Sequence, residues 1–196
     1  GGIWIPCAGS QSPWNTHIGS EEDYDLFFTA ASGKEYKKAQ KGLKAMSELY
    51  FEGKKEANPY DYGYITEVAV DKAGKTNVTK HYAMGRGTWE MSKIMSDNKT
   101  AFFGDDGAYV GLYMYIGDNA TNLDSGTLYA AKWIQTNEDG AKDGGKANLS
   151  WIKLGHASSQ EVAQWKTQYT FNDIFEAYAP AQFDAIKHEG FKAIKA

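Results

Sequence analysis

Five short segments, each ending at a turn rich in Gly, Asp or Asn, follow one another along the chain. The segments are YGYITEVAV (62–70), KTAFFGDD (99–106), GLYMYIGD (111–118), GTLYAAKWIQT (126–136) and ANLSWIKLG (147–155). Period-two alternation and short apolar runs bounded by such turns are typical of β-strands. The series therefore predicts an antiparallel β architecture, and its spacing fits a sandwich, a barrel or the blades of a propeller.

Helical insertions are predicted on both sides of these strands. Apolar residues recur with a helical period over 34–52, with lysines on the other face, which predicts an inserted helix. The stretch SSQE (158–161) has the form of a capping box and predicts a helix that continues through Val162 and Trp165. The apolar run at 2–5 is expected to be a strand that enters a polar loop at Pro6.

Length and charge limit the possible roles. With 196 residues, of which 42% are hydrophobic, the chain is expected to form a single domain over 1–196. A net charge of −4, with no run of Lys or Arg longer than two, argues against nucleic-acid binding. No stretch is long and apolar enough to predict a membrane span. Because the sequence starts with Gly-Gly-Ile-Trp and stops inside a Lys-rich periodic segment, we expect it to be part of a longer chain.

The stretch CAGSQSPWNTHIGSEED (7–23) contains the only cysteine, and it ends in Glu21, Glu22 and Asp23. Thiolates favour iron, copper or zinc, whereas carboxylates favour calcium or magnesium. Clustered carboxylates also repel one another unless a cation neutralises them. The stretch is therefore a candidate mixed metal site. The alternative is that Cys7 is a small core residue and the acids are solvated.

A second acidic pair, Asp105 and Asp106, lies in the sequence Gly-Asp-Asp-Gly at the end of a predicted strand. Glycines allow the backbone to bring two carboxylates around one hard cation, although a polar β-turn would have the same sequence. His17 is a weaker candidate ligand because no His-x-x-His pair accompanies it.

Two basic residues are candidates for binding an anionic substrate. Arg86 could hold such a group by a forked hydrogen bond, or could pair with Glu90 four residues later. Lys132 alternates onto the face of Leu128 and Ala130, where a buried ammonium would need a carboxylate or an anion nearby. An exposed lysine on an edge strand is the alternative. The sequence has no phosphate loop of the Walker type, no Gly-x-Ser-x-Gly, no His-Glu-x-x-His and no CxxC.

Five motifs in collinear order, over roughly residues 2 to 134, resemble the family of PhoX-type bacterial alkaline phosphatases. The opening CAGSQSPWNTHIGSEED resembles the family's C-x-G-G-x-T-P-W-G-T-W-L-x-x-E-E-N, and YGYITEV resembles Y-G-W-V-x-E-V. MGRGTWEMS resembles L-G-R-F-x-H-E-x-A. AFFGDDGAYVGLYMY and SGTLYAAKW resemble Y-x-G-D-D and G-T-L-Y-x-A-K-F.

This resemblance implies a six-bladed type of β-propeller that hydrolyses phosphate monoesters with iron and calcium. It places Cys7 as an iron ligand and Glu90 as a metal-bridging ligand, both catalytic, with further metal ligands among Glu21, Glu22, Asp105 and Asp106. Arg86 and Lys132 would contact the substrate phosphate. The resemblance also implies a periplasmic or secreted protein.

The chain departs from the family pattern at several positions. Asp23 replaces an asparagine, Trp89 replaces a histidine, and Asn15 and His17 stand in the Trp-Gly-Thr-Trp segment. A later family segment, D-R-P-E, has no match. We therefore expect an incomplete propeller, completed by another chain or self-associating through open strand edges. The alternatives are a calcium-stabilised extracellular binding or scaffold protein without catalysis, and a β-rich module that binds no metal.

Overall fold

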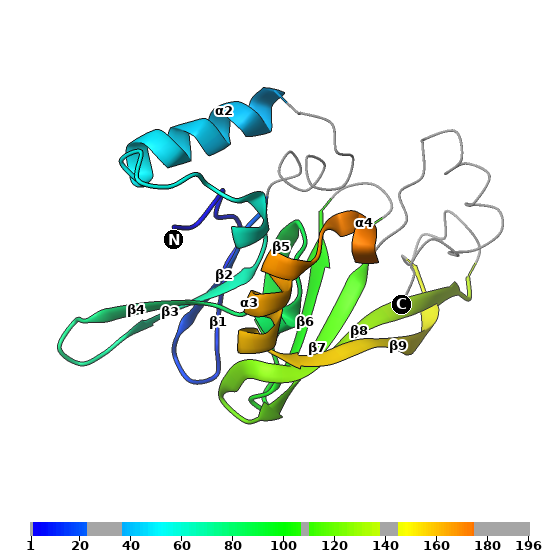
Figure 1. Cartoon of the computed structure of the whole chain (residues 1–196). Coiled ribbons are helices and arrows are strands. Elements are labelled where there is room, and N and C mark those ends of the chain that lie inside the picture. Colours follow the sequence, from blue (N-terminus) through cyan, green and yellow to red (C-terminus); the bar gives the residue numbers. More distant parts are fainter. Residues whose placement is uncertain (1, 23–36, 107–109, 138–144, 175–196) are drawn as a thin grey trace.

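The computed structural model describes residues 2–22, 37–106, 110–137 and 145–174. These residues form two antiparallel sheets that follow one another along the chain (Figure 1). The N-terminal sheet has the order β1-β2-β3-β4, with bounds Ser10–Gln11, His17–Ser20, Ile65–Val70 and Thr76–Lys80. The C-terminal sheet has the order β5-β6-β7-β8-β9, with bounds Trp89–Ile94, Thr100–Asp105, Leu112–Asn119, Asn122–Gln135 and Ala147–Ser158.

Helical segments connect and flank the sheets. In chain order they are α2 (Lys37–Ala45), the π-helical turn η1 (Met46–Tyr50), the 3-10 turns η2 (Pro59–Asp61) and η3 (Tyr82–Met84), α3 (Ser159–Gln168) and α4 (Phe171–Ile174). Leu43 and Met46 pack with Trp4 against the buried Tyr62, which attaches α2 to the rest of the chain. The helix α3 contacts η3, β8 and β9.

The main hydrophobic core lies between the two sheets. Ile18 and Ile65 come from the N-terminal sheet, and η3 adds Ala83 and Met84. The C-terminal sheet contributes the remaining buried residues, Trp89, Ile94, Ala101, Phe103, Tyr115 and Leu123. In the register of β6 and β7, Ala101 lies opposite Tyr115 and Phe103 opposite Tyr113, so one face of that sheet points into the core.

The predicted mainly β architecture is confirmed, and four of the five predicted strands correspond closely to β6, β7, β8 and β9. The strand predicted at 62–70 begins only at Ile65, because Gly63 has a positive φ of 91° that interrupts extended backbone. The strand expected at 2–5 is wrong: Gly2 and Ile5 have φ values of 81° and 42°, and only an isolated bridge joins Pro6 to Glu21. Neither sheet closes on itself within the described ranges.

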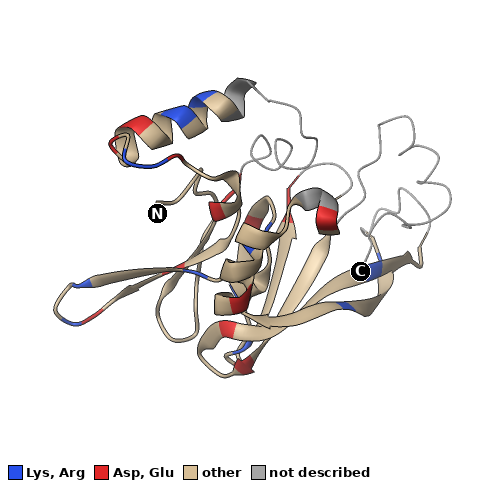
Figure 2. Ribbon diagram, in the orientation of Figure 1, with Lys and Arg blue, Asp and Glu red and all other residues tan. Residues whose placement is uncertain are grey.

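Charged residues are few on the strands of the C-terminal sheet (Figure 2), and Lys41 and Lys44 of α2 are exposed. The helix predicted over 34–52 is present as α2 and η1, with residues 34–36 outside the described ranges. The predicted capping box is confirmed, since Ser158 caps α3 and Glu161 bonds back to it. No helix in the described part of the chain is long and apolar enough to cross a membrane.

Candidate metal centre

Three ligand-type side chains from separate segments converge at one place. Cys7 precedes β1, Glu22 follows β2 and Glu90 lies in β5. One ligand atom from each side chain lies within 4.8 Å of the other two, and the Cys7 thiol is 3.9 Å from Oε1 of Glu90. Cys7 is exposed and the two carboxylates are half-buried, so the cluster is open to solvent. The structure thus brings together three of the residues that the sequence indicated as metal ligands.

Main-chain hydrogen bonds hold the three segments side by side. The amide of Glu22 donates to the carbonyl of Ile5 at 3.0 Å, and the amide of Cys7 donates to that of Ser20 at 3.2 Å. Trp89 donates to the carbonyl of Glu21 at 3.1 Å, which joins β5 to the end of β2. Segments more than 60 residues apart in the sequence therefore meet at the junction of the two sheets.

The electrostatics of the cluster favour a cation. A hydrogen bond to Glu22 raises the pKa of the Cys7 thiol above its ordinary value, with burial as a weaker cause in the same direction. The charge of Glu22 likewise raises the pKa of Glu90, and Asp106 adds to this effect. Each acid disfavours ionisation of its neighbours, and a bound cation would reverse that repulsion.

Glu21 does not belong to this cluster. Its side chain is 1% exposed and accepts hydrogen bonds from the amides of Trp4 (2.7 Å), Gly63 (3.0 Å) and Tyr64 (3.1 Å). Lys80 Nζ is 2.8 Å from Oε1 of the same carboxylate. The two glutamates are adjacent in the chain, and only Glu22 joins the cluster. Protein donors thus already surround the Glu21 carboxylate, which sets it apart from the other predicted ligands.

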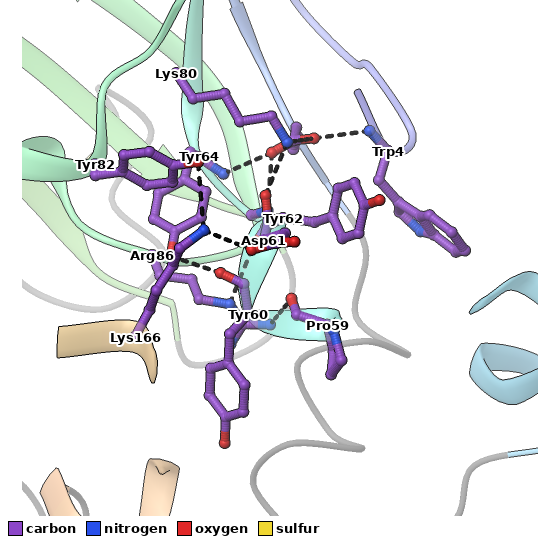
Figure 3. A network of polar contacts seen from close by, with 12 residues as sticks. Trp4, Pro59, Tyr60, Asp61, Tyr62, Tyr64, Lys80, Tyr82, Arg86 and Lys166 are labelled. Atoms are coloured by element: carbon purple, nitrogen blue, oxygen red, sulfur yellow. Dashed lines mark hydrogen bonds and ion pairs between the residues drawn. The ribbon is translucent and has the colours of Figure 1, made fainter. Parts of the chain in front are cut away.

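Figure 3 shows a network of polar contacts that includes Trp4, Asp61, Lys80, Arg86 and Lys166. Lys80 also donates to the carbonyl of Asp61 at 2.9 Å and lies over the ring of Tyr62. Burial lowers the pKa of Lys80, and the Glu21 carboxylate opposes this shift. Lys166 of α3 pairs with the Asp61 carboxylate, so the network links the N-terminal segment, η2, β4 and α3.

Arg86 belongs to the same region. Its guanidinium donates to the carbonyls of Tyr62 at 2.9 Å and Pro59 at 3.0 Å, and it lies 5.1 Å from the centre of the Tyr60 ring. These contacts hold the η2 turn against the residues that follow η3. Its predicted contact with a substrate anion stays a prediction.

The acidic pair at the end of β6 divides between two environments. Asp105 is half-buried and accepts a hydrogen bond from the amide of Gly111 at 2.7 Å, while burial raises its pKa. Asp106 is exposed, and its charge acts on Glu90.

Lys132 lies on β8, which β7 and β9 flank, and it is exposed, so it needs no buried counter-ion. Asp23 lies outside the described residues.

Two features of the site were missed in the sequence. Trp89, which stands where the family pattern has histidine, is buried edge-on against Phe103 (4.9 Å) and Tyr113 (5.2 Å), so it packs in the core. Ser20 is buried, and its hydroxyl donates to the carbonyls of Ala8, next to Cys7, and of Glu90. A serine in a short strand carries no sequence signal for partners 12 and 70 residues away.

The family model for alkaline phosphatase PhoX matches residues 1–192. The chain belongs to the PhoX alkaline phosphatase family. Among solved structures, it is similar to "Pseudomonas fluorescens PhoX in complex with vanadate, a transition state analogue", with 24% identity and a TM-score of 0.53. The match covers 78% of this chain and 30% of the Pseudomonas chain, and at this identity it shows a shared fold. No curated protein matches the chain.

Proposed function

We propose that this chain forms part of a metal-dependent phosphomonoesterase in which Cys7, Glu22 and Glu90 hold the metal. The convergence of their ligand atoms within 4.8 Å carries this proposal, together with membership of the PhoX family. A thiolate beside two carboxylates combines the soft donor that iron accepts with the hard oxygens that calcium prefers. The donor set therefore fits both of the expected metals.

Each predicted residue has a role that follows from its position. Cys7 is proposed as the iron ligand and Glu90 as the bridging carboxylate, with Glu22 as a further carboxylate ligand. Asp106, whose charge acts on Glu90, is a proposed calcium ligand, and Asp105 accepts the amide of Gly111. Glu21 supports the site from the buried side through its three amide donors.

The reaction would be hydrolysis of a phosphate monoester. When bound, the cations would supply positive charge to the phosphoryl oxygens and assist the attacking oxygen nucleophile. The exposed Lys132 and the Arg86 guanidinium remain the proposed contacts for the phosphate group. The Arg86 guanidinium has five N–H donors, and two of them donate to the carbonyls of Tyr62 and Pro59.

We also propose that the two sheets are blades of an incomplete propeller whose remaining sheets lie on other polypeptide. The match with the Pseudomonas structure covers 30% of the Pseudomonas chain. On the outer face of the C-terminal sheet, Phe102, Met114 and Tyr129 are cross-strand neighbours, and Leu149 and Trp133 are paired and exposed. A further antiparallel sheet would cover this apolar face. A periplasmic or secreted location belongs to the same proposal.

Hydrolysis of p-nitrophenyl phosphate by the protein supplied with iron and calcium tests the proposal. We expect release of p-nitrophenol that a chelator abolishes and that Glu90→Gln lowers on the order of 100-fold, since a metal ligand is lost. Glu56→Gln, an exposed position away from the cluster, is the matched control. Equal rates with and without chelator would contradict the proposal. Calcium binding without turnover would favour the scaffold alternative.

A further inference from the structure

Ser20 lies at the point where the segments of the proposed metal centre meet. Its side chain is 1% exposed, and its hydroxyl is 2.6 Å from the carbonyl of Glu90 and 3.2 Å from that of Ala8. A hydroxyl has one proton, so the shorter contact is the main hydrogen bond and the Ala8 carbonyl shares it. The carbonyl of Ser20 in turn accepts the amide of Cys7 at 3.2 Å.

These contacts connect the segment that carries Cys7 with the segment that carries Glu90 through one residue. Ser20 ends β2, so Glu22 is two residues further along the chain. The hydroxyl fixes the main chain of Glu90, and the carbonyl fixes the main chain of Cys7. The distance between a thiolate and a carboxylate on separate segments depends on how firmly those segments are joined.

We propose that Ser20 is a positioning residue that sets the spacing of Cys7 and Glu90 and thereby the affinity of the metal centre. The proposal rests on the proposed function, because it concerns ligands of the same centre. Ser20 touches no metal ligand atom in the described structure; it acts through the carbonyl and amide groups that carry those ligands. Second-layer partners of this kind typically change metal affinity by about 10- to 100-fold.

The chain offers a matched control in Ser92. It is also buried, at 2% exposed, and lies in β5 two residues after Glu90. In the described part of the chain its hydroxyl has no hydrogen-bond partner. Its carbonyl accepts a hydrogen bond from Ser10, a contact that substitution by alanine would preserve. Ser20→Ala and Ser92→Ala therefore remove the same atom at the same depth, but only the first breaks a link between ligand segments.

Titration of the protein with Co²⁺ tests the proposal without any assay of activity. The charge-transfer absorption of a Co²⁺–thiolate bond reports this site alone, because Cys7 is the only cysteine. We expect Ser20→Ala to raise the Kd for Co²⁺ about tenfold or more, while Ser92→Ala leaves it within about twofold of wild type. Both variants should melt within about 4 °C of wild type, because each loses at most one hydrogen bond.

An unchanged Co²⁺ Kd in Ser20→Ala, with the band present in wild type and lost in Cys7→Ala, would overturn the positioning role and leave the proposed metal centre intact. Equal weakening in both serine variants would also overturn it, because the effect would then come from any buried hydroxyl. Absence of the band in wild type would overturn the positioning role and the thiolate ligand of the proposed function together.

Discussion

Adjacent residues in this chain have opposite environments, and this difference defines the site. Glu21 accepts three amide hydrogen bonds and pairs with Lys80, whereas Glu22 joins Cys7 and Glu90 at the solvent-accessible cluster. The sequence predicted that both glutamates lie near a metal. It could not separate them, because the donors that surround Glu21 come from Trp4, Gly63 and Tyr64, which only the folded chain brings together.

Removing the counter-charge of Glu21 should destabilise the fold. We expect Lys80→Met to lower the free energy of unfolding by about 3 kcal/mol or more, because it leaves a carboxylate buried with an uncompensated charge. Lys72→Met, at an exposed position in the turn between β3 and β4, should change it by less than about 0.5 kcal/mol. Urea denaturation of both variants measures the difference. Equal stabilities would show that the ion pair contributes nothing.

A second carboxylate, that of the partly buried Glu67, should make stability depend on acid pH. Burial would raise the pKa of Glu67, but hydrogen bonds from His81, Thr16 and Trp14 outweigh it and lower the pKa to about 2. The pKa is therefore lower in the folded than in the unfolded state, so the stabilisation is complete above about pH 5 and is lost as the pH falls toward 2.

Glu67→Gln should remove most of this dependence, which amounts to on the order of 2–3 kcal/mol of unfolding free energy. Chemical denaturation of wild type and Glu67→Gln at a series of pH values from about 5 to about 2 measures it, with Glu56→Gln as the exposed control. Parallel curves for wild type and Glu67→Gln would refute the assignment of this acid sensitivity to Glu67.

Most of the strands that alternate or end at Gly/Asp turns were predictable from the sequence. The strands β6, β7, β8 and β9 alternate or end in Gly/Asp turns, and the structure has them close to the predicted positions. β4 is mostly exposed, so burial imposes no alternation on it. β5 does alternate, but its residues Trp89 and Glu90 were interpreted as part of a motif and the strand was missed. The positive φ values at Gly2, Ile5 and Gly63 could not be predicted from the hydrophobic pattern of the sequence.

The N-terminus of α3 gives an element-scale prediction. The Ser158 hydroxyl accepts the amide of Glu161 at 3.2 Å, and the Glu161 carboxylate accepts the Ser158 amide at 2.8 Å. Ser158→Ala should lower the unfolding free energy by about 1 kcal/mol. Gln160→Ala, in the first turn of the same helix, should be neutral or slightly stabilising because alanine has the higher helix propensity. Thermal denaturation of both variants measures the change in stability. A loss of stability in Gln160→Ala with none in Ser158→Ala would contradict the role of Ser158 as the cap.

At the scale of the whole molecule, two open sheets share one core and leave an apolar outer face exposed. Met91, Leu112, Leu149 and Trp133 of the C-terminal sheet are 46%, 37%, 42% and 55% exposed. The family resemblance predicted further blades, and the described residues show two open sheets without closure. Composition and periodicity cannot supply this information, because the strand spacing fits a sandwich, a barrel and a propeller equally.

This surface should make the isolated chain associate. We expect the weight-average mass from light scattering to rise with protein concentration, because no sheet among the described residues covers the apolar face. Leu149→Lys combined with Trp133→Lys should reduce the association, as both side chains lie on that face. Lys substitutions at Val70 and Val78, exposed on the N-terminal sheet, are the control. A monomer at all concentrations in wild type would contradict this prediction.

Elemental analysis of the purified, undialysed protein tests whether Cys7, Glu22 and Glu90 bind a metal. Wild type is predicted to contain iron and calcium, and Cys7→Ala to lose the iron while keeping calcium, since the thiolate is the soft ligand. Glu56→Gln should retain both metals. Calcium alone in wild type and Cys7→Ala would contradict the iron role of Cys7, and the absence of both metals from wild type would contradict the metal centre itself.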